Sequence, residues 1–146
     1  MNHHHAFERD YLAWYTRTGN TTGTPFDPAS LVAAVRAQYP GKPAWAEAFA
    51  RCMRHWDRSE LYTYFLSPPD RRARWNYAGG FFLDDARWGT LTVDLIHDPN
   101  GPGGIAIGGI EFLDRVMGYP TSVREFRAMF AGDVQSALPK RAGPTS

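Results

Sequence analysis

The chain has 146 residues, of which 43% are hydrophobic and 21% are charged, and its formal net charge is +1. That length predicts one domain with a sizeable core, and the near-neutral charge disfavours a nucleic-acid-binding protein, which would carry a clearly basic surface. The single cysteine, Cys52, excludes an intramolecular disulfide, and no run of about 18 apolar residues predicts a membrane span. We therefore expect a cytoplasmic protein with no membrane partner, in which residues 1–137 form one domain and residues 138–146 a disordered tail.

Helical periodicity dominates the first part of the chain. Apolar side chains three and four residues apart predict a first helix over residues 7–15. A second helix should begin at Asp27–Pro28, an N-cap acceptor followed by a proline suited to the first turn, and should end before Pro40. Pro43 is expected to begin a third helix that continues to Trp56.

Strand-forming residues follow. Residues 61–66 are rich in aromatic and β-branched side chains and predict a first strand. Three apolar runs, 80–83, 91–96 and 105–112, are separated by turn-forming residues and predict an antiparallel meander. The capping-box pair Ser122–Glu125 then predicts a last helix.

The order of these elements predicts an α+β fold. We expect an antiparallel sheet of about four strands, with the meander at residues 79–112, packed against the N-terminal helices and one C-terminal helix. No segment of helix length separates the later strands, which argues against parallel βαβ wiring.

The last apolar run changes phase at Gly108–Gly109. The isoleucines before the two glycines share one phase of the strand, whereas Ile110 and Phe112 share the opposite phase. One extra residue would reconcile the two, and glycine within a strand is typical of a β-bulge. Such a bulge would either turn Glu111 in a chosen direction or simply curve the sheet over a helix.

The charges are unevenly distributed along the chain. Residues 51–78 hold six basic and three acidic side chains, whereas residues 79–115 hold two basic and six acidic ones. Pairing between the two segments inside the protein would explain this distribution. An acidic sheet that faces a partner would explain it as well.

Motifs for nucleotide binding, for zinc proteases and for serine hydrolases are absent from the sequence. The side chains that could supply acid–base chemistry in the meander are Asp94, His97, Asp98, Glu111 and Asp114. If the two strands pair, His97 and Glu111 lie several residue pairs apart, too far for a direct hydrogen bond. His55 with Asp57 gives no stronger indication, and the spacing predicts no catalytic residue, no metal site and no cofactor.

The segment GTLTVDLIHD, residues 89–98, is followed by a turn and then by IGGIEFLDRV, residues 107–116. This pattern resembles the endings of small bacterial immunity proteins of polymorphic toxin systems, in which a strand pair ends in a GGIEFL segment that leads into a helix. The resemblance spans residues 89–116 and implies a cytoplasmic protein that neutralises a toxin domain by occupying its surface. It transfers no site residue, because the shared positions have a structural character.

These features lead to the hypothesis of a non-catalytic protein-binding factor of the immunity or antitoxin type. Many toxin domains are basic, so acidic loops of the meander with one aromatic anchor would suit such a contact. The predicted partner-binding residues are Asp84, Asp85, Trp88 and Asp98.

A rival hypothesis is a small-molecule-binding protein or a cofactor-free enzyme, with an aromatic pocket between the sheet and the helices. The residues expected to line that pocket are Trp14, Tyr15, Trp45, Trp56, Tyr62, Tyr64, His55 and His97. The sequence leaves the oligomeric state open.

Overall fold

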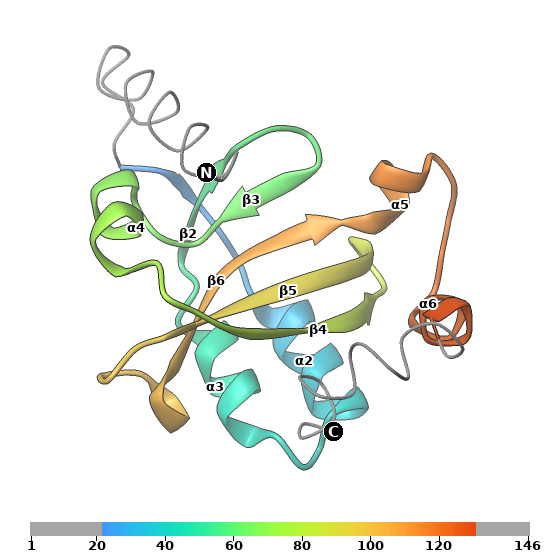
Figure 1. Ribbon diagram of the computed structural model, residues 1–146, viewed down its shortest axis with the longest axis horizontal. Helices are drawn as coiled ribbons and strands as arrows, with labels where there is room; N and C mark the ends of the chain where they lie inside the picture. The colour runs from blue at the N-terminus through green and yellow to red at the C-terminus, as the bar shows by residue number, and fades with distance from the viewer. Residues whose placement is uncertain (1–21, 131–146) are drawn as a thin grey trace.

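A six-stranded antiparallel sheet organises residues 22–130, the part of the chain that this computed structural model describes (Figure 1). The strands are β1 (Thr24–Pro25), β2 (Arg54–Asp57), β3 (Tyr62–Tyr64), β4 (Tyr77–Asp85), β5 (Gly89–His97) and β6 (Ile105–Phe112). They lie in the order β1-β2-β3-β6-β5-β4. The predicted α+β class and the antiparallel meander are confirmed, and the sheet is larger than the four strands expected.

Five α-helices and one short 3₁₀ turn accompany the sheet within these residues. They are α2 (Ala29–Gln38), α3 (Pro43–Ala50), α4 (Pro68–Arg74), η1 (Pro102–Gly104), α5 (Leu113–Met117) and α6 (Val123–Phe130). Among residues 22–130, no helix has the length and apolar content that a bilayer crossing requires. The helix expected over residues 7–15 and the tail expected at 138–146 lie outside the described residues, as do Trp14 and Tyr15.

The third helix is shorter than predicted, because it ends at Ala50 and the chain then forms β2. The apolar spacing around Trp56 fits a helix, yet Trp56 pairs with Tyr64 of β3, and Arg54 pairs with Pro25 of β1. These backbone partners are distant in the sequence, so local periodicity could not reveal them. The two short outer strands, β1 and β2, therefore account for the larger sheet.

The β-bulge predicted at the two glycines is present in β6. Asp94 pairs with Gly109, but the next residue of β5, Leu95, pairs with Ile107, which leaves Gly108 as the extra residue. The bulge shifts the strand by one residue, so the apolar side chains on both sides of it face the core despite their opposite phases in the sequence.

The main core lies between α2, α3 and one face of the sheet, which we call the covered face. Figure 1 shows α2 and α3 together on one side of the strands. Leu31 and Val35 of α2, Phe49 of α3 and Val93 of β5 are completely buried in this core. The opposite face, here called the outer face, carries the alternate side chains of the same strands.

A smaller aromatic cluster covers one end of the outer face, where Figure 1 places α4 beside β2 and β3. Trp56 and Tyr64 are buried there and contact Trp75, which follows α4. Arg71 of α4 is 1% exposed, and its guanidinium carbon lies 3.9 Å from the centroid of the Tyr64 ring. The Arg71 side chain also donates a hydrogen bond to the carbonyl of Leu66 at 2.6 Å.

Two side chains at the end of α2 contact the backbone of β4, the strand at the edge of the sheet. The side-chain amide of Gln38 donates to the carbonyl of Asp84 at 2.6 Å and accepts from the Asp84 N–H at 2.9 Å. The hydroxyl of Tyr39 donates to the carbonyl of Phe82 and accepts a 2.9 Å hydrogen bond from Arg127 of α6. These bonds hold α2 and α6 against the edge strand.

Candidate functional site

Asp85, the first of the predicted partner-binding residues, shapes the turn between β4 and β5. It is 5% exposed, and its Oδ2 accepts hydrogen bonds from the backbone N–H groups of Arg87 (2.9 Å) and Trp88 (2.8 Å). The hydroxyl of Ser30 on α2 approaches the same oxygen at 3.4 Å. Asp85 is therefore an internal acceptor that fixes the turn and connects it to α2.

Asp84 is also engaged within the protein. Its Oδ1 accepts from the backbone N–H of Val123 at 2.9 Å, at the start of α6, and lies 3.0 Å from the Thr90 hydroxyl. That hydroxyl is also 2.7 Å from the carbonyl of Thr121, and Thr90 is 1% exposed. The segment leading into α6 therefore covers this end of the outer face.

Asp98, in the loop between β5 and β6, stabilises that loop. Its Oδ1 accepts from the backbone N–H of Asn100 at 3.0 Å. Its Oδ2 forms a 3.6 Å ion pair with Arg74 of α4. This pair joins the basic segment 51–78 to the acidic segment 79–115, as expected for internal compensation of charge.

Trp88 packs inward. It is half-buried against the main core, and its ring lies 6.2 Å from Phe26 and 5.9 Å from Phe112, measured between centroids. Its Nε1 is buried and has no hydrogen-bond partner among the described residues. The four predicted partner-binding side chains thus all make contacts inside the fold.

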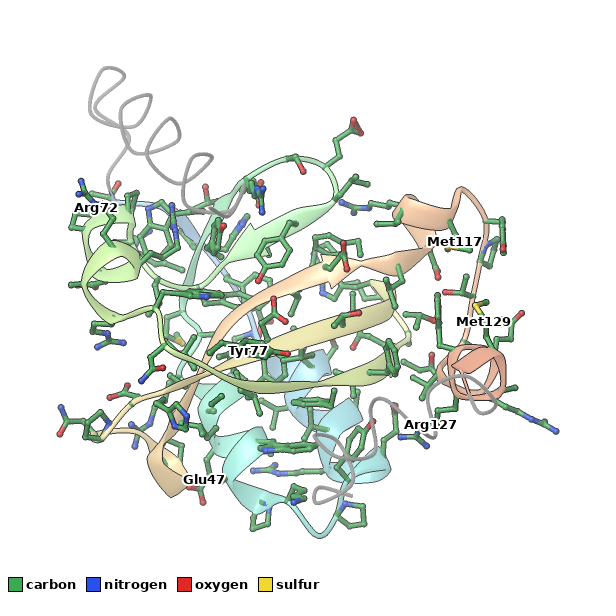
Figure 2. The ribbon with its side chains drawn as sticks, viewed as in Figure 1. Glu47, Arg72, Tyr77, Met117, Arg127 and Met129 are labelled. Carbon is green, nitrogen blue, oxygen red and sulfur yellow. The ribbon has the colours of Figure 1, made fainter. Side chains whose placement is uncertain are left out.

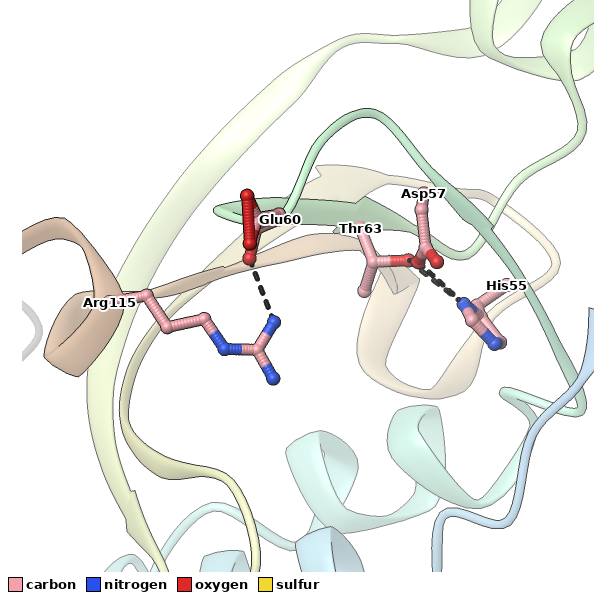
Figure 3. A network of polar contacts seen from close by, with 5 residues as sticks. All are labelled: His55, Asp57, Glu60, Thr63 and Arg115. Carbon is pink, nitrogen blue, oxygen red and sulfur yellow. Dashed lines mark hydrogen bonds and ion pairs between the residues drawn. The ribbon is translucent and has the colours of Figure 1, made fainter.

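His55, Asp57 and Thr63 form a polar network across β2 and β3 (Figure 3). Asp57 Oδ1 accepts from the Thr63 hydroxyl at 2.7 Å and lies 2.8 Å from Nδ1 of His55. The Thr63 hydroxyl oxygen is 3.1 Å from that same nitrogen. A nucleophilic triad needs the two ring nitrogens to bind different groups, the hydroxyl on one side and the carboxylate on the other. Here the hydroxyl and the carboxylate both contact Nδ1, so the arrangement is not that of a triad. The network instead joins the side chains of β2 and β3.

His97 and Glu111, two of the other acid–base candidates, are far apart, as predicted. His97 pairs with Ile105, whereas Glu111 pairs with Thr92 five residues earlier in β5, so no direct hydrogen bond can join the two. The view in Figure 3 also includes Arg115, which donates a 2.8 Å hydrogen bond to the backbone carbonyl of residue 60.

The predicted aromatic pocket residues lie on two different faces. Trp45 stacks on Phe81 at a centroid distance of 4.0 Å and belongs to the core on the covered face. Trp56, Tyr62 and Tyr64 belong to the cluster on the outer face. The sheet separates these two groups, so within residues 22–130 they do not line a common cavity.

The outer face brings together two carboxylates, Asp94 of β5 and Glu111 of β6. The register places Asp94 beside Gly109 and Glu111 beside Thr92, so the two acids are diagonal neighbours. Both are half-buried, and neither forms an ion pair with a lysine or arginine in the part of the chain that the structure describes. The hydroxyl of Tyr62 donates a 2.6 Å hydrogen bond to Asp94 Oδ2. We call these three residues the Asp94 cluster.

Burial controls the acidity of the Asp94 cluster. Burial raises the pKa of the Asp94 carboxyl above its ordinary value, and the hydrogen bond from Tyr62 partly opposes that rise. Burial, followed by the charge of Asp94, raises the pKa of Glu111, while Arg58 acts in the opposite direction. Burial is also the main reason that the pKa of Tyr62 lies well above its usual range. The fold therefore holds two carboxylates in a setting that disfavours their charged forms.

The two adjacent glycines of the bulge allow two aromatic rings to pack directly against the backbone of β6. A Cβ atom on Gly109 would lie 2.5 Å from the ring of Tyr62, and one on Gly108 would lie 2.6 Å from the ring of Trp75. Only glycine allows these rings to lie flat on β6. The IGGIEF segment thus positions Tyr62 over the strand, within hydrogen-bond reach of Asp94.

The sequence indicated Asp94 and Glu111 as acid–base candidates but did not predict that they lie together. The alternation of β5 places Asp94 on the polar face, and the phase change at the bulge singles out Glu111. Tyr62 was expected in the aromatic pocket. Its position opposite Glu111 depends on the pairing of β3 with β6. No sequence signal specified that pairing.

Comparisons of the chain with protein-family models, with curated proteins and with solved structures gave no match.

Proposed function

We propose that this chain is a non-catalytic protein-binding factor, of the immunity or antitoxin type, that binds a basic partner protein through its outer face. The Asp94 cluster carries this proposal. Its two carboxylates are desolvated and have no cationic ion-pair partner within residues 22–130, and such an arrangement lowers stability in the free protein. Lysine or arginine side chains of a partner would add positive charge beside these carboxylates, where Arg58 already lowers the pKa of Glu111.

The surroundings of the cluster suit a protein contact. Gly80 and Gly109 flank Asp94 on the neighbouring strands, where the Tyr77 hydroxyl lies near Gly80 and the Tyr62 ring lies over Gly109. Tyr77 is 50% exposed, and Figure 2 shows it in front of the middle of the sheet. Exposed tyrosine is a residue type enriched in binding hot spots.

Co-expression with the product of the neighbouring open reading frame tests the proposal. The proposal expects that product to be toxic alone, to be neutralised by this chain, and to form a complex that weakens as the ionic strength rises. Replacing both acids, Asp94→Asn with Glu111→Gln, should weaken the complex at least about tenfold, because two complementary charges are lost.

A matched control removes the same charge elsewhere. Glu47 on α3 and Asp70 on α4 are exposed and lie outside the cluster, and Figure 2 shows Glu47 on the helical side. Glu47→Gln with Asp70→Asn should leave the affinity unchanged. Equal affinity of both double variants would contradict the outer face as the interface, and a harmless neighbouring product that does not bind would contradict the immunity role.

A further inference from the structure

A pocket of about 150 Å³ lies between the end of α3, α4 and the loop that joins β5 to β6. It is separate from the Asp94 cluster and shares no residue with it. Its volume is about half the roughly 300 Å³ typical of drug-sized ligand sites, but a cavity of roughly this size holds a single benzene ring. Only a compact ligand of this size would fit.

The inner wall of the pocket is mainly apolar. The residues that form it include Ala48, Cys52, Phe65, Ala106 and Ile107. Burial raises the pKa of the Cys52 thiol, and its sulfur lies 3.6 Å from the carbonyl of Ala48, so this side chain acts as a small neutral surface. Such a wall favours a hydrocarbon body.

The mouth of the pocket is cationic. Arg51 follows α3 and donates one hydrogen bond, at 3.2 Å, to the carbonyl of Asn100. Arg74 ends α4, and its contact with Asp98 is an ion pair at 3.6 Å, longer than a hydrogen bond. Each guanidinium has five N–H donors, so both retain donors for a further acceptor. Two arginines against one carboxylate leave the mouth with a net positive charge.

We infer that this pocket binds a small organic anion, with its carboxylate held by Arg51 and Arg74 and its compact apolar body against the inner wall. Guanidinium groups recognise carboxylates by paired hydrogen bonds, which gives the mouth its preference for that head group. A body of about six carbon atoms fills the available volume. This inference is independent of the proposed function, because the two sites share no residue.

Binding of benzoate, benzyl alcohol and acetate separates the contribution of the carboxylate group to affinity from that of the apolar ring. Titration of the full-length protein, followed by backbone amide chemical shifts, should give a dissociation constant of about 1 mM for benzoate, with shifts concentrated at the lining segments 48–52, 65–66 and 101–107. Benzyl alcohol has the body without the charge, and acetate has the charge without the body. Each should bind at least about fivefold more weakly than benzoate. Equal binding of all three would overturn the inference.

Variants test the assigned residues. Arg51→Gln and Arg74→Gln should each weaken benzoate binding by about fivefold to tenfold, whereas Arg72→Gln is the matched control, because Arg72 lies on α4 away from the pocket (Figure 2). Ala106→Leu should fill the cavity and abolish binding, and its unfolding curve would verify that the variant folds. Undiminished binding by Arg51→Gln and Arg74→Gln, or shifts confined to residues that do not line the pocket, would contradict the site.

Discussion

The protein holds two sets of acidic side chains on the same meander, and they differ in how the fold treats them. At the turn after β4, Asp84 and Asp85 receive hydrogen bonds from backbone N–H groups of Val123, Arg87 and Trp88. In the Asp94 cluster on the outer face, the Tyr62 hydroxyl donates to Asp94, and burial raises the pKa of both the Asp94 and the Glu111 carboxyl. The first set fixes the turn through backbone hydrogen bonds, although Asp85 Oδ1 is buried with no hydrogen-bond partner among the described residues, whereas burial disfavours the charged forms of the second set.

The difference shows that acidity in a sequence segment does not by itself indicate a binding surface. Backbone donors compensate a buried carboxylate, so a turn aspartate belongs to the architecture even when its segment is strongly acidic. Carboxylates that remain undercompensated on an accessible face are stronger candidates for recognition. Three variants and one pH series test this contrast.

Asp85→Ala should have the largest effect, a loss of about 3 kcal/mol in the free energy of unfolding, because two N–H donors in a part-buried turn would lose a charged acceptor. Urea denaturation measures this change. Asp85→Asn keeps an oxygen acceptor and should recover part of the loss. A change below about 1 kcal/mol for the alanine variant would show that the turn does not depend on Asp85.

Gly109→Ala should destabilise the protein by about 2 kcal/mol, because the added methyl would lie 2.5 Å from the Tyr62 ring and 2.6 Å from the Thr63 carbonyl. The variant should also displace the Tyr62 hydroxyl from Asp94, which tyrosine fluorescence and side-chain nuclear magnetic resonance would detect. Gly41→Ala is the control, since nothing lies within 4 Å of a Cβ there. Equal stability of the two variants would show that close packing of the Tyr62 ring does not require glycine at position 109.

Asp94→Asn with Glu111→Gln should raise the free energy of unfolding at neutral pH by roughly 0.5–1 kcal/mol, because the variant removes two charges that burial disfavours. Asparagine still offers an oxygen to the Tyr62 hydroxyl. Thermal and urea unfolding measure the gain. A loss of stability would mean that these acids support the fold in the way that Asp84 and Asp85 do.

The pH dependence of the same double variant gives the smallest effect. In the wild-type protein, the raised pKa values mean that Asp94 and Glu111 bind protons more tightly when folded, so their contribution is fully present below their unfolded pKa values of about 4. That contribution is lost as the pH rises through the folded pKa values. The stability advantage of the variant should therefore grow from about pH 4 upward and then level off. A constant difference across this range would contradict the raised pKa values.

Much of the fold followed from local patterns. The proline-marked start of α2 is confirmed, and its first turn includes a 3.0 Å hydrogen bond from the Ala29 N–H to Asp27. The start of α6 is confirmed by the Ser122 hydroxyl, which accepts from the Glu125 N–H at 3.1 Å. The bulge at Gly108 could be predicted because a phase change in an alternating strand requires an extra residue.

The remainder depended on contacts between distant residues. Residues 54–57 form a strand only because Thr24 and Tyr64 provide backbone partners on either side. The burial of Asp85 depends on α2 packing beside the turn, and the position of Tyr62 depends on β3 lying next to β6. Composition and spacing could indicate which segment was acidic, but not which of its carboxylates the backbone would compensate.

The glutamine at the end of α2 has a consequence for how copies of this protein meet in solution. The edge of a sheet is a template on which another strand can polymerise, and unprotected edges promote fibrils and aggregates. Gln38 offers the Asp84 N–H and carbonyl the same pair of bonds that an incoming strand would offer. By bonding as a peptide group would, this one side chain occupies the backbone groups of Asp84 and blocks the addition of a seventh strand at that point.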